Sequence, residues 1–99
     1  LTKLSTQKGV RAGYLLDVSK AGSYQMIFKM HSGENPFAQL PVSIFVNGVL
    51  QQTTTFNGTD NKIIERAVTI SFTESGENQL TLFFGESGVR MDEILLVQE

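Results

Sequence analysis

Apolar and polar residues alternate along most of this chain, which is the pattern of β-strands that bury one face. In "GSYQMIFKM", residues 22–30, every second residue from Tyr24 to Met30 is apolar, and Gln25 and Lys29 lie between them. The same period of two runs through residues 40–46, 64–72 and 80–84. The pattern therefore predicts a half-buried strand in each of these segments.

Other segments complete the expected set of strands. "AGYLLDV", residues 12–18, and "VRMDEILLV", residues 89–97, are rich in apolar residues. Clusters such as "SKAG", "HSGENP" and "ESGEN" separate the strands, several at the spacing typical of an all-β sandwich or barrel. No segment of about ten residues has a helical period. We therefore expect about seven antiparallel strands in an all-β fold.

A hairpin is expected at "FVNGVL", residues 45–50. A two-residue type I′ turn requires positive φ at both central positions, and Asn47 and Gly48 adopt it at the least cost. The strand that returns after the turn is Thr-rich and is expected to lie near a sheet edge. One face of this strand carries Val49, Gln51, Thr53 and Thr55.

The phase within each strand also predicts which side chains fill the core. Two antiparallel sheets would bury the residues that keep one phase, since a slip of one residue would turn them all to solvent. The predicted core consists of Tyr24, Met26, Phe28, Val42, Ile44, Val68, Ile70, Leu80 and Leu82.

Composition fits one domain. The chain has 99 residues, of which 40% are hydrophobic and 18% charged, so residues 1–99 are interpreted as a single domain. The formal net charge of −2 gives no basic excess to attract nucleic acid or an anionic membrane. No apolar run approaches the about 20 residues of a membrane span. With no Cys, disulfides and thiolate chemistry are excluded, and the compartment stays open.

Four blocks of the chain resemble, in order, the motifs of carbohydrate-binding modules of families 6 and 35. "AGSYQMIFKMHSG" is similar to the family's Gly-Tyr strand, "PVSIFVNG" to its Val-Asn-Gly hairpin, "SGENQLTL" to its Gly-x-Asn strand, and "VRMDEILLV" to its closing strand. The positions that match are Ala21, Gly22, Tyr24, Phe28, Lys29, Gly33, Gly76, Asn78, Asp92 and Ile94.

This resemblance implies a fold and a function. The fold is a jelly-roll-like antiparallel β-sandwich, in agreement with the alternation. The function is non-catalytic binding of a polysaccharide or oligosaccharide, by an accessory domain of a secreted glycoside hydrolase. The partners are then the carbohydrate and a catalytic domain of the same protein, with no nucleic acid and no membrane. The location is extracellular, secreted or at the cell surface.

Asp92 is the one candidate metal ligand. In the families, the Asp of the last strand shares a structural calcium with an acidic first strand, but no acid precedes Asp17 in this chain. Calcium takes six to eight oxygen ligands, several from carboxylates. We therefore expect no cofactor, and calcium stays open only if other residues supply the missing ligands.

The candidate ligand-binding residues lie in loops that correspond to binding loops of the families. Asp60 and Asn61 lie in "FNGTDNK", and Arg90 follows "ESGV" at the start of the last strand. Arg90 has a planar fork that takes two hydroxyls or a carboxylate, which favours an acidic sugar. The chain has no Trp, so other aromatic rings would have to stack on a sugar. The candidates are Tyr14 and Phe56, or else Phe37, which lies beside the loop "HSGENP". Packing in the core is the alternative for each ring.

A catalytic role is not predicted. The acids lie mostly in turns rather than in a pair across a cleft, as glycoside hydrolysis requires. The chain has no nucleophile elbow or zinc-protease motif. His31 is the only His and is interpreted as a surface turn residue.

Two other functions remain open. The chain would be a structural sandwich that packs on a catalytic domain if Tyr14, Phe37 and Phe56 were all buried. A protein-binding domain for adhesion or assembly would instead expose a large apolar patch on one sheet face.

Overall fold

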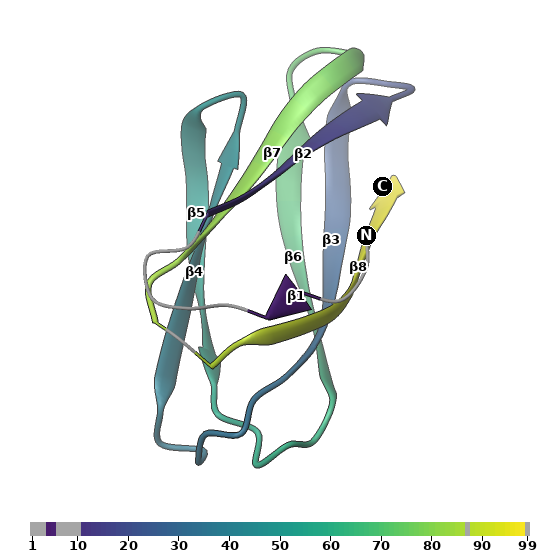
Figure 1. Ribbon diagram of the computed structural model, residues 1–99. Helices are drawn as coiled ribbons and strands as arrows, with labels where there is room; N and C mark the ends of the chain where they lie inside the picture. Colours follow the sequence, from purple (N-terminus) through teal and green to yellow (C-terminus); the bar gives the residue numbers. More distant parts are fainter. Residues whose placement is uncertain (1–3, 6–10, 87, 99) are drawn as a thin grey trace.

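The computed structural model describes residues 4–5, 11–86 and 88–98, which form two antiparallel sheets packed face to face (Figure 1). One sheet has the order β1-β8-β3-β6 and the other has the order β2-β7-β4-β5. The strands are β1 (Leu4–Ser5), β2 (Arg11–Val18), β3 (Gly22–His31), β4 (Gln39–Val46), β5 (Val49–Asn57), β6 (Ile64–Phe72), β7 (Gly76–Phe84) and β8 (Arg90–Gln98). The described residues contain no helix, and hence no helix that could cross a membrane.

The chain crosses between the sheets at most of its connections. Only β4 and β5 are consecutive long strands in the same sheet. The turns after β2, β4 and β6 lie at one end of the sandwich, and the loops after β3 and β5 lie at the other end (Figure 1). The predicted all-β, antiparallel sandwich is confirmed, and every long strand predicted from the alternation is present.

The core lies between the two sheets and follows the predicted phase. Each residue of the predicted core is buried, except Val68, which is half-buried and packs against the others. Phe72, Phe84, Val89 and Met91 add to the same cluster. Tyr24 meets the Phe72 ring edge-on, with 5.4 Å between the ring centroids. Such edge-to-face pairs are favourable because the positive edge of one ring faces the negative face of the other.

The predicted type I′ hairpin is confirmed by the backbone. Asn47 has φ 50° and Gly48 has φ 82°, and Val46 pairs with Val49 across the turn. The Asn47 side chain also reaches the neighbouring strand β7, where its Oδ1 accepts from Gln79 N at 2.8 Å and its Nδ2 donates to Asn78 Oδ1 at 2.8 Å. Two motifs that are far apart in the sequence, "VNG" and "GEN", therefore meet at this end of the sandwich.

A β-bulge lies just after the hairpin. Ile44 pairs with Gln52 and Phe45 pairs with Leu50, so Gln51 is the extra residue on β5. Beyond the bulge every pair is displaced by one residue, which places Phe56 opposite the buried Leu40. Cross-strand partners point to the same face, so Phe56 faces the core.

Side chains of β5 cover the open edge of β6 in the other sheet. The Gln51 amide accepts from Ser71 N at 2.9 Å and donates to Ser71 O at 2.5 Å, and Gln52 Nε2 donates to Thr69 O at 2.9 Å. Arg66 reaches back and donates to Thr55 O. An uncovered edge is a template for unwanted strand pairing, so these contacts both join the sheets and protect β6.

Candidate functional site

Three loops meet at the end of the sandwich opposite the Asn47-Gly48 hairpin. They are residues 32–38 between β3 and β4, residues 58–63 between β5 and β6, and the described residues 85–86 and 88–89 between β7 and β8. The first two are joined by backbone hydrogen bonds, from Asp60 N to Glu34 O at 3.0 Å and from Asn61 N to Ser32 O at 2.7 Å. The third approaches them at Gly88, where an added Cβ would lie 3.2 Å from Glu34 Cγ. We call this surface the loop end.

A buried contact between Thr59 and Ser32 holds two of these loops together. Thr59 Oγ1 accepts from Ser32 N at 2.8 Å and donates to Ser32 O at 3.1 Å. Ser32 is fully buried and Thr59 nearly so, so these bonds replace water that the groups have lost. Nothing in the sequence indicates this contact, because its two partners are far apart in the chain.

Gly58 allows the two larger loops to touch. A Cβ at this position would lie 2.0 Å from Asn35 O and 2.5 Å from Glu34 O, which no side chain can tolerate. Close approach of two backbones is a typical reason for glycine. Beyond Thr59, Asp60 and Asn61 have φ 51° and 66°, in the left-handed region that Asp and Asn tolerate better than most residues. Their backbones are thus fixed, and both residues are exposed.

Phe37 is the most exposed aromatic ring at the loop end. It is 91% exposed, and Ile63 on the adjacent loop is 65% exposed. An Asx turn holds Phe37 in place, because Asn35 Oδ1 accepts from Phe37 N at 2.9 Å and Asn35 O accepts from Ala38 N at 3.1 Å. Asn57 Nδ2 also donates to Pro36 O at 3.0 Å. The structure thus presents a large apolar ring to solvent on a loop fixed at both sides, which is the arrangement suited to stacking on a ligand.

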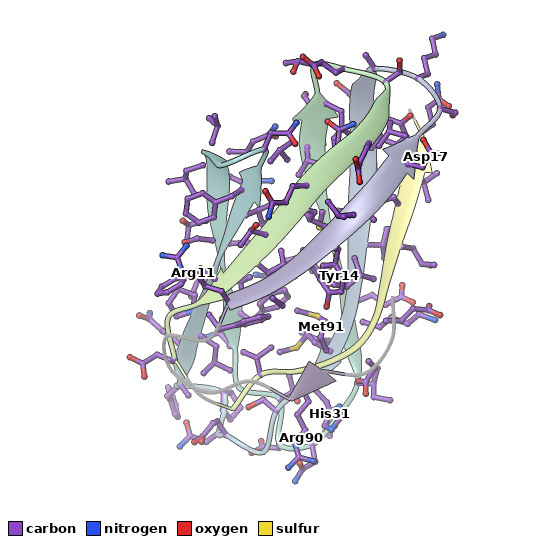
Figure 2. The ribbon with its side chains drawn as sticks, turned by 45° about the horizontal axis from the view of Figure 1, so that its top comes forward. Arg11, Tyr14, Asp17, His31, Arg90 and Met91 are labelled. Atoms are coloured by element: carbon purple, nitrogen blue, oxygen red, sulfur yellow. The ribbon has the colours of Figure 1, made fainter. Side chains whose placement is uncertain are left out.

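Arg90 stands beside His31 at the same end of the molecule. Arg90 is the first residue of β8, is exposed, and pairs across the sheet with His31, the last residue of β3 (Figure 2). His31 is half-buried, and its Nδ1 lies 2.7 Å from Asp92 Oδ2. The interpretation of His31 as a surface turn residue is therefore wrong. A second bulge explains the contact, since Met30 pairs with Met91 and Lys29 with Glu93, which leaves Asp92 extra on β8 and re-aims its side chain.

The described residues do not fit a calcium site at Asp92. One carboxylate oxygen already contacts His31, and an imidazole is not a ligand that calcium prefers. Within the described part of the chain no three His, Cys, Asp or Glu side chains lie close enough to hold a metal ion together. Asp92 is accordingly interpreted as a partner of His31, with side-chain exposures of 24% for His31 and 18% for Asp92.

Phe56 is not available to a ligand, so its assignment as a stacking ring is wrong. It is fully buried, and its ring meets Phe28 edge-on at 5.7 Å between the centroids. The Arg66 guanidinium lies over the Phe56 ring, 4.8 Å from its centroid. The physical reason is the bulge at Gln51, which turns Phe56 toward the core.

Tyr14 also lies away from the loop end. It is half-buried on the inner face of β2, pairs in register with Leu80, and packs against the core. The structure thus brings together Asp60, Asn61 and the β7–β8 loop that leads to Arg90, and adds Phe37 to them. Phe56 is not part of this surface, because it is buried, and Tyr14 packs against the core.

Comparison with known proteins identifies a protein of similar sequence. No family model matches the chain. A β-glucosidase from Ruminococcus albus is 30% identical over 95 residues, which cover 96% of this chain and 10% of that protein. The chain therefore spans about a tenth of the length of this relative.

Solved structures show the same architecture. A family 35 carbohydrate-binding module from Clostridium thermocellum superimposes with a TM-score of 0.81 at 20% identity, over 94% of this chain and 73% of that one. The C-terminal family 6 module of a laminarinase from Zobellia galactanivorans gives a TM-score of 0.79 at 14% identity, over 93% and 75% of the two chains. At such identities the likeness concerns the fold. The chain has the fold of the carbohydrate-binding modules of families 6 and 35, as its four sequence motifs predict.

Proposed function

We propose that this chain is a non-catalytic carbohydrate-binding module and that the loop end holds the ligand. The observation that carries the proposal is the 91% exposed ring of Phe37 on a loop whose backbone is hydrogen-bonded to the loop that carries the exposed residues Asp60 and Asn61. Sugar sites combine an apolar surface for the face of the ring with a few polar groups for its hydroxyls. The fold and the glycosidase relative support the same class of ligand.

In this proposal each residue has a distinct role. Phe37 stacks on a sugar ring, and Asp60 and Asn61 accept or donate hydrogen bonds to hydroxyls from a loop whose backbone is already fixed. Arg90 takes two hydroxyls or a carboxylate, so an acidic sugar such as a uronic acid is the preferred ligand. Binding does not require calcium, because Asp92 contacts His31. The chain would act as an extracellular accessory domain of a larger glycoside hydrolase.

Affinity should be weak, because a single stacking ring and a few solvent-exposed polar groups give few desolvated contacts. We expect a Kd of about 0.1 to 10 mM, which corresponds to a binding free energy of about 3 to 5 kcal/mol. NMR titration of the labelled domain with neutral and acidic oligosaccharides, with and without a chelator, measures both the affinity and the residues that respond. Shifts should concentrate at residues 34–37, 60–62 and 90.

Variants at the loop end separate this function from its alternatives. Phe37→Ala should weaken binding about tenfold or more, since stacking on one ring contributes about 1 to 3 kcal/mol in comparable nucleic-acid sites. Arg90→Ala should weaken acidic sugars more than neutral ones. The matched controls are Leu95→Ala, an exposed apolar residue on β8, and Lys20→Ala, a cation at the opposite end. If no sugar bound at millimolar concentration, the structural sandwich would be the better account.

A further inference from the structure

Residues 35–38, with the sequence Asn-Pro-Phe-Ala, form the turn that carries the exposed ring of Phe37 at the loop end. Asn at the first position and Pro at the second are typical of a β-turn, because Pro holds its own φ near the value that the second position needs. The turn closes in the expected way, since Asn35 O accepts from Ala38 N at 3.1 Å. Phe37 therefore occupies the third position of the turn.

Two asparagine side chains hold the peptide bond that joins Pro36 to Phe37. Its N–H, which belongs to Phe37, donates to Asn35 Oδ1 at 2.9 Å. Its carbonyl, which belongs to Pro36, accepts from Asn57 Nδ2 at 3.0 Å. A peptide unit is planar, so hydrogen bonds to both of its polar groups fix the orientation of that plane. Because the N–Cα bond of Phe37 lies in this plane, the two amides limit the directions in which the Phe37 ring can point.

One of these asparagines belongs to the turn, whereas the other comes from a sheet. Asn57 is the last residue of β5 and lies 21 positions from Pro36 along the chain. It pairs with Gln39 on β4, and the residue after it, Gly58, donates from its N to Ala38 O at 3.1 Å. The amide of Asn57 thus joins the turn to a strand whose own position is set by the sheet.

The hydrogen bond from Asn57 to Pro36 affects the order of the turn more than the stability of the fold. Both residues are exposed, and so is Phe37. A hydrogen bond between exposed groups replaces similar bonds to water, so its net contribution to the free energy of unfolding is small. A ring that becomes ordered only when a ligand arrives loses binding free energy, however, whereas a ring already in place does not. An aromatic side chain has two χ angles, so little freedom remains once its backbone is held.

We propose that Asn57 is a positioning residue for sugar binding, which acts by holding Phe37 in the orientation that stacks on the ligand rather than by touching the ligand. The inference rests on the proposed function, since it names what keeps the stacking ring of that site in place. The position requires a donor, because the carbonyl of Pro36 can only accept. An ionised Asp has the shape of Asn but offers only acceptors, so it cannot replace Asn57 in this contact.

NMR relaxation and sugar titration of two variants test the inference. Asn57→Val and Asn57→Asp both remove the donor, the second with a new charge, and both should keep wild-type signal dispersion because residue 57 is exposed. The order parameter of the Phe37 amide should fall from about 0.85, the value of a rigid backbone, toward about 0.6. Affinity for trigalacturonate and for cellotriose should fall about two- to tenfold in Asn57→Val. The matched control is Thr55→Val, exposed on the same strand, which should change neither quantity.

A double-mutant cycle separates positioning from any other effect of Asn57. In the Phe37→Ala background, Asn57→Val should cause no further loss of affinity, because the ring through which Asn57 acts is gone. The initial slopes of the titrations give this comparison even when binding is weak.

The possible failures are distinguishable. A loss that persists in the Phe37→Ala background would overturn the inference, and so would an unchanged order parameter at Phe37. Binding that is weakened by Phe37→Ala but not by Asn57→Val would overturn the inference and leave the proposed function in place. A wild-type chain that bound neither sugar would overturn the proposed function, and with it the role of Asn57 in binding.

Discussion

Single hydroxyl and amide groups organise the loop end, although most of its surface is polar and exposed. Thr59 bonds both backbone groups of Ser32, and Asn35 holds the turn that presents Phe37. Each of these hydrogen bonds satisfies a backbone group that has no partner in a sheet, because it lies in an irregular loop. At the residue scale, a ligand site of this kind depends on a few buried hydrogen bonds as much as on the groups that touch the ligand.

Removing the Thr59 hydroxyl should therefore destabilise the domain. Thr59→Val keeps the side-chain shape but leaves the buried N–H of Ser32 without its partner, which costs about 1 to 3 kcal/mol. We expect Tm to fall by about 5 to 15 °C in a thermal melt followed by circular dichroism. The matched control is Thr53→Val, where the hydroxyl is exposed and a β-branched residue suits the strand. Equal melting of the two variants would show that the Thr59–Ser32 contact contributes nothing.

Two local features determine which side chains of β5 point to the core and which point to solvent. The type I′ turn sets the start of the hairpin, and the bulge at Gln51 then displaces the register by one residue. A regular hairpin would place Thr55 opposite Leu40 and turn Phe56 outward, whereas the bulge buries Phe56 and leaves Thr55 exposed. The same bulge directs Gln51 to the edge of β6. At the element scale, one extra residue thus sets the core and joins the two sheets.

The turn itself is open to a direct test. Gly48 has φ 82°, and Gly48→Val places a β-branched side chain in the left-handed region, at a cost of about 1 to 2 kcal/mol or more. We expect a lower midpoint in urea unfolding with an unchanged slope. Gly13→Val is the matched control, because its position lies in a strand with open space around the added Cβ. Unfolding of Gly48→Val at the wild-type midpoint would contradict a strained turn.

The whole molecule is stabilised by the core between two sheets and by the links between their edges. Met26, Phe28, Ile44, Ile70 and Leu82 are fully buried there. Contacts between the sheets are long-range in sequence, so the fold exists only when all strands are in place. A buried charge therefore has a large effect, because no strand can move to hydrate the charge without exposing the apolar core residues of the other strands to water.

Ile70→Asp should unfold the domain. An unpaired carboxylate in the core costs several kcal/mol, comparable with the about 5 to 15 kcal/mol of total stability expected for a domain. The variant should lose NMR signal dispersion at 25 °C, whereas Ser71→Asp, one residue along and on the exposed face, should retain it. A folded Ile70→Asp with the wild-type Tm would be incompatible with the observed phase of β6.

The sequence determined the all-β class, the strands, the hairpin and the core, because these depend on a period of two and on the φ preference of Asn47 and Gly48. Four motifs in order also predicted the fold of the carbohydrate-binding modules. All these signals are local: each is carried by neighbouring residues and needs no knowledge of which strands meet.

Only the tertiary structure decided which side chains reach the loop end. Phe56 is buried and Asp92 contacts His31 because bulges shift the register, and a bulge leaves no mark in the alternation. Phe37 is exposed because Asn35, Asn57 and the adjacent loop fix its turn. Contacts between distant segments, such as that of Thr59 with Ser32, form only when the sheets have assembled, so their position is a property of the packed molecule.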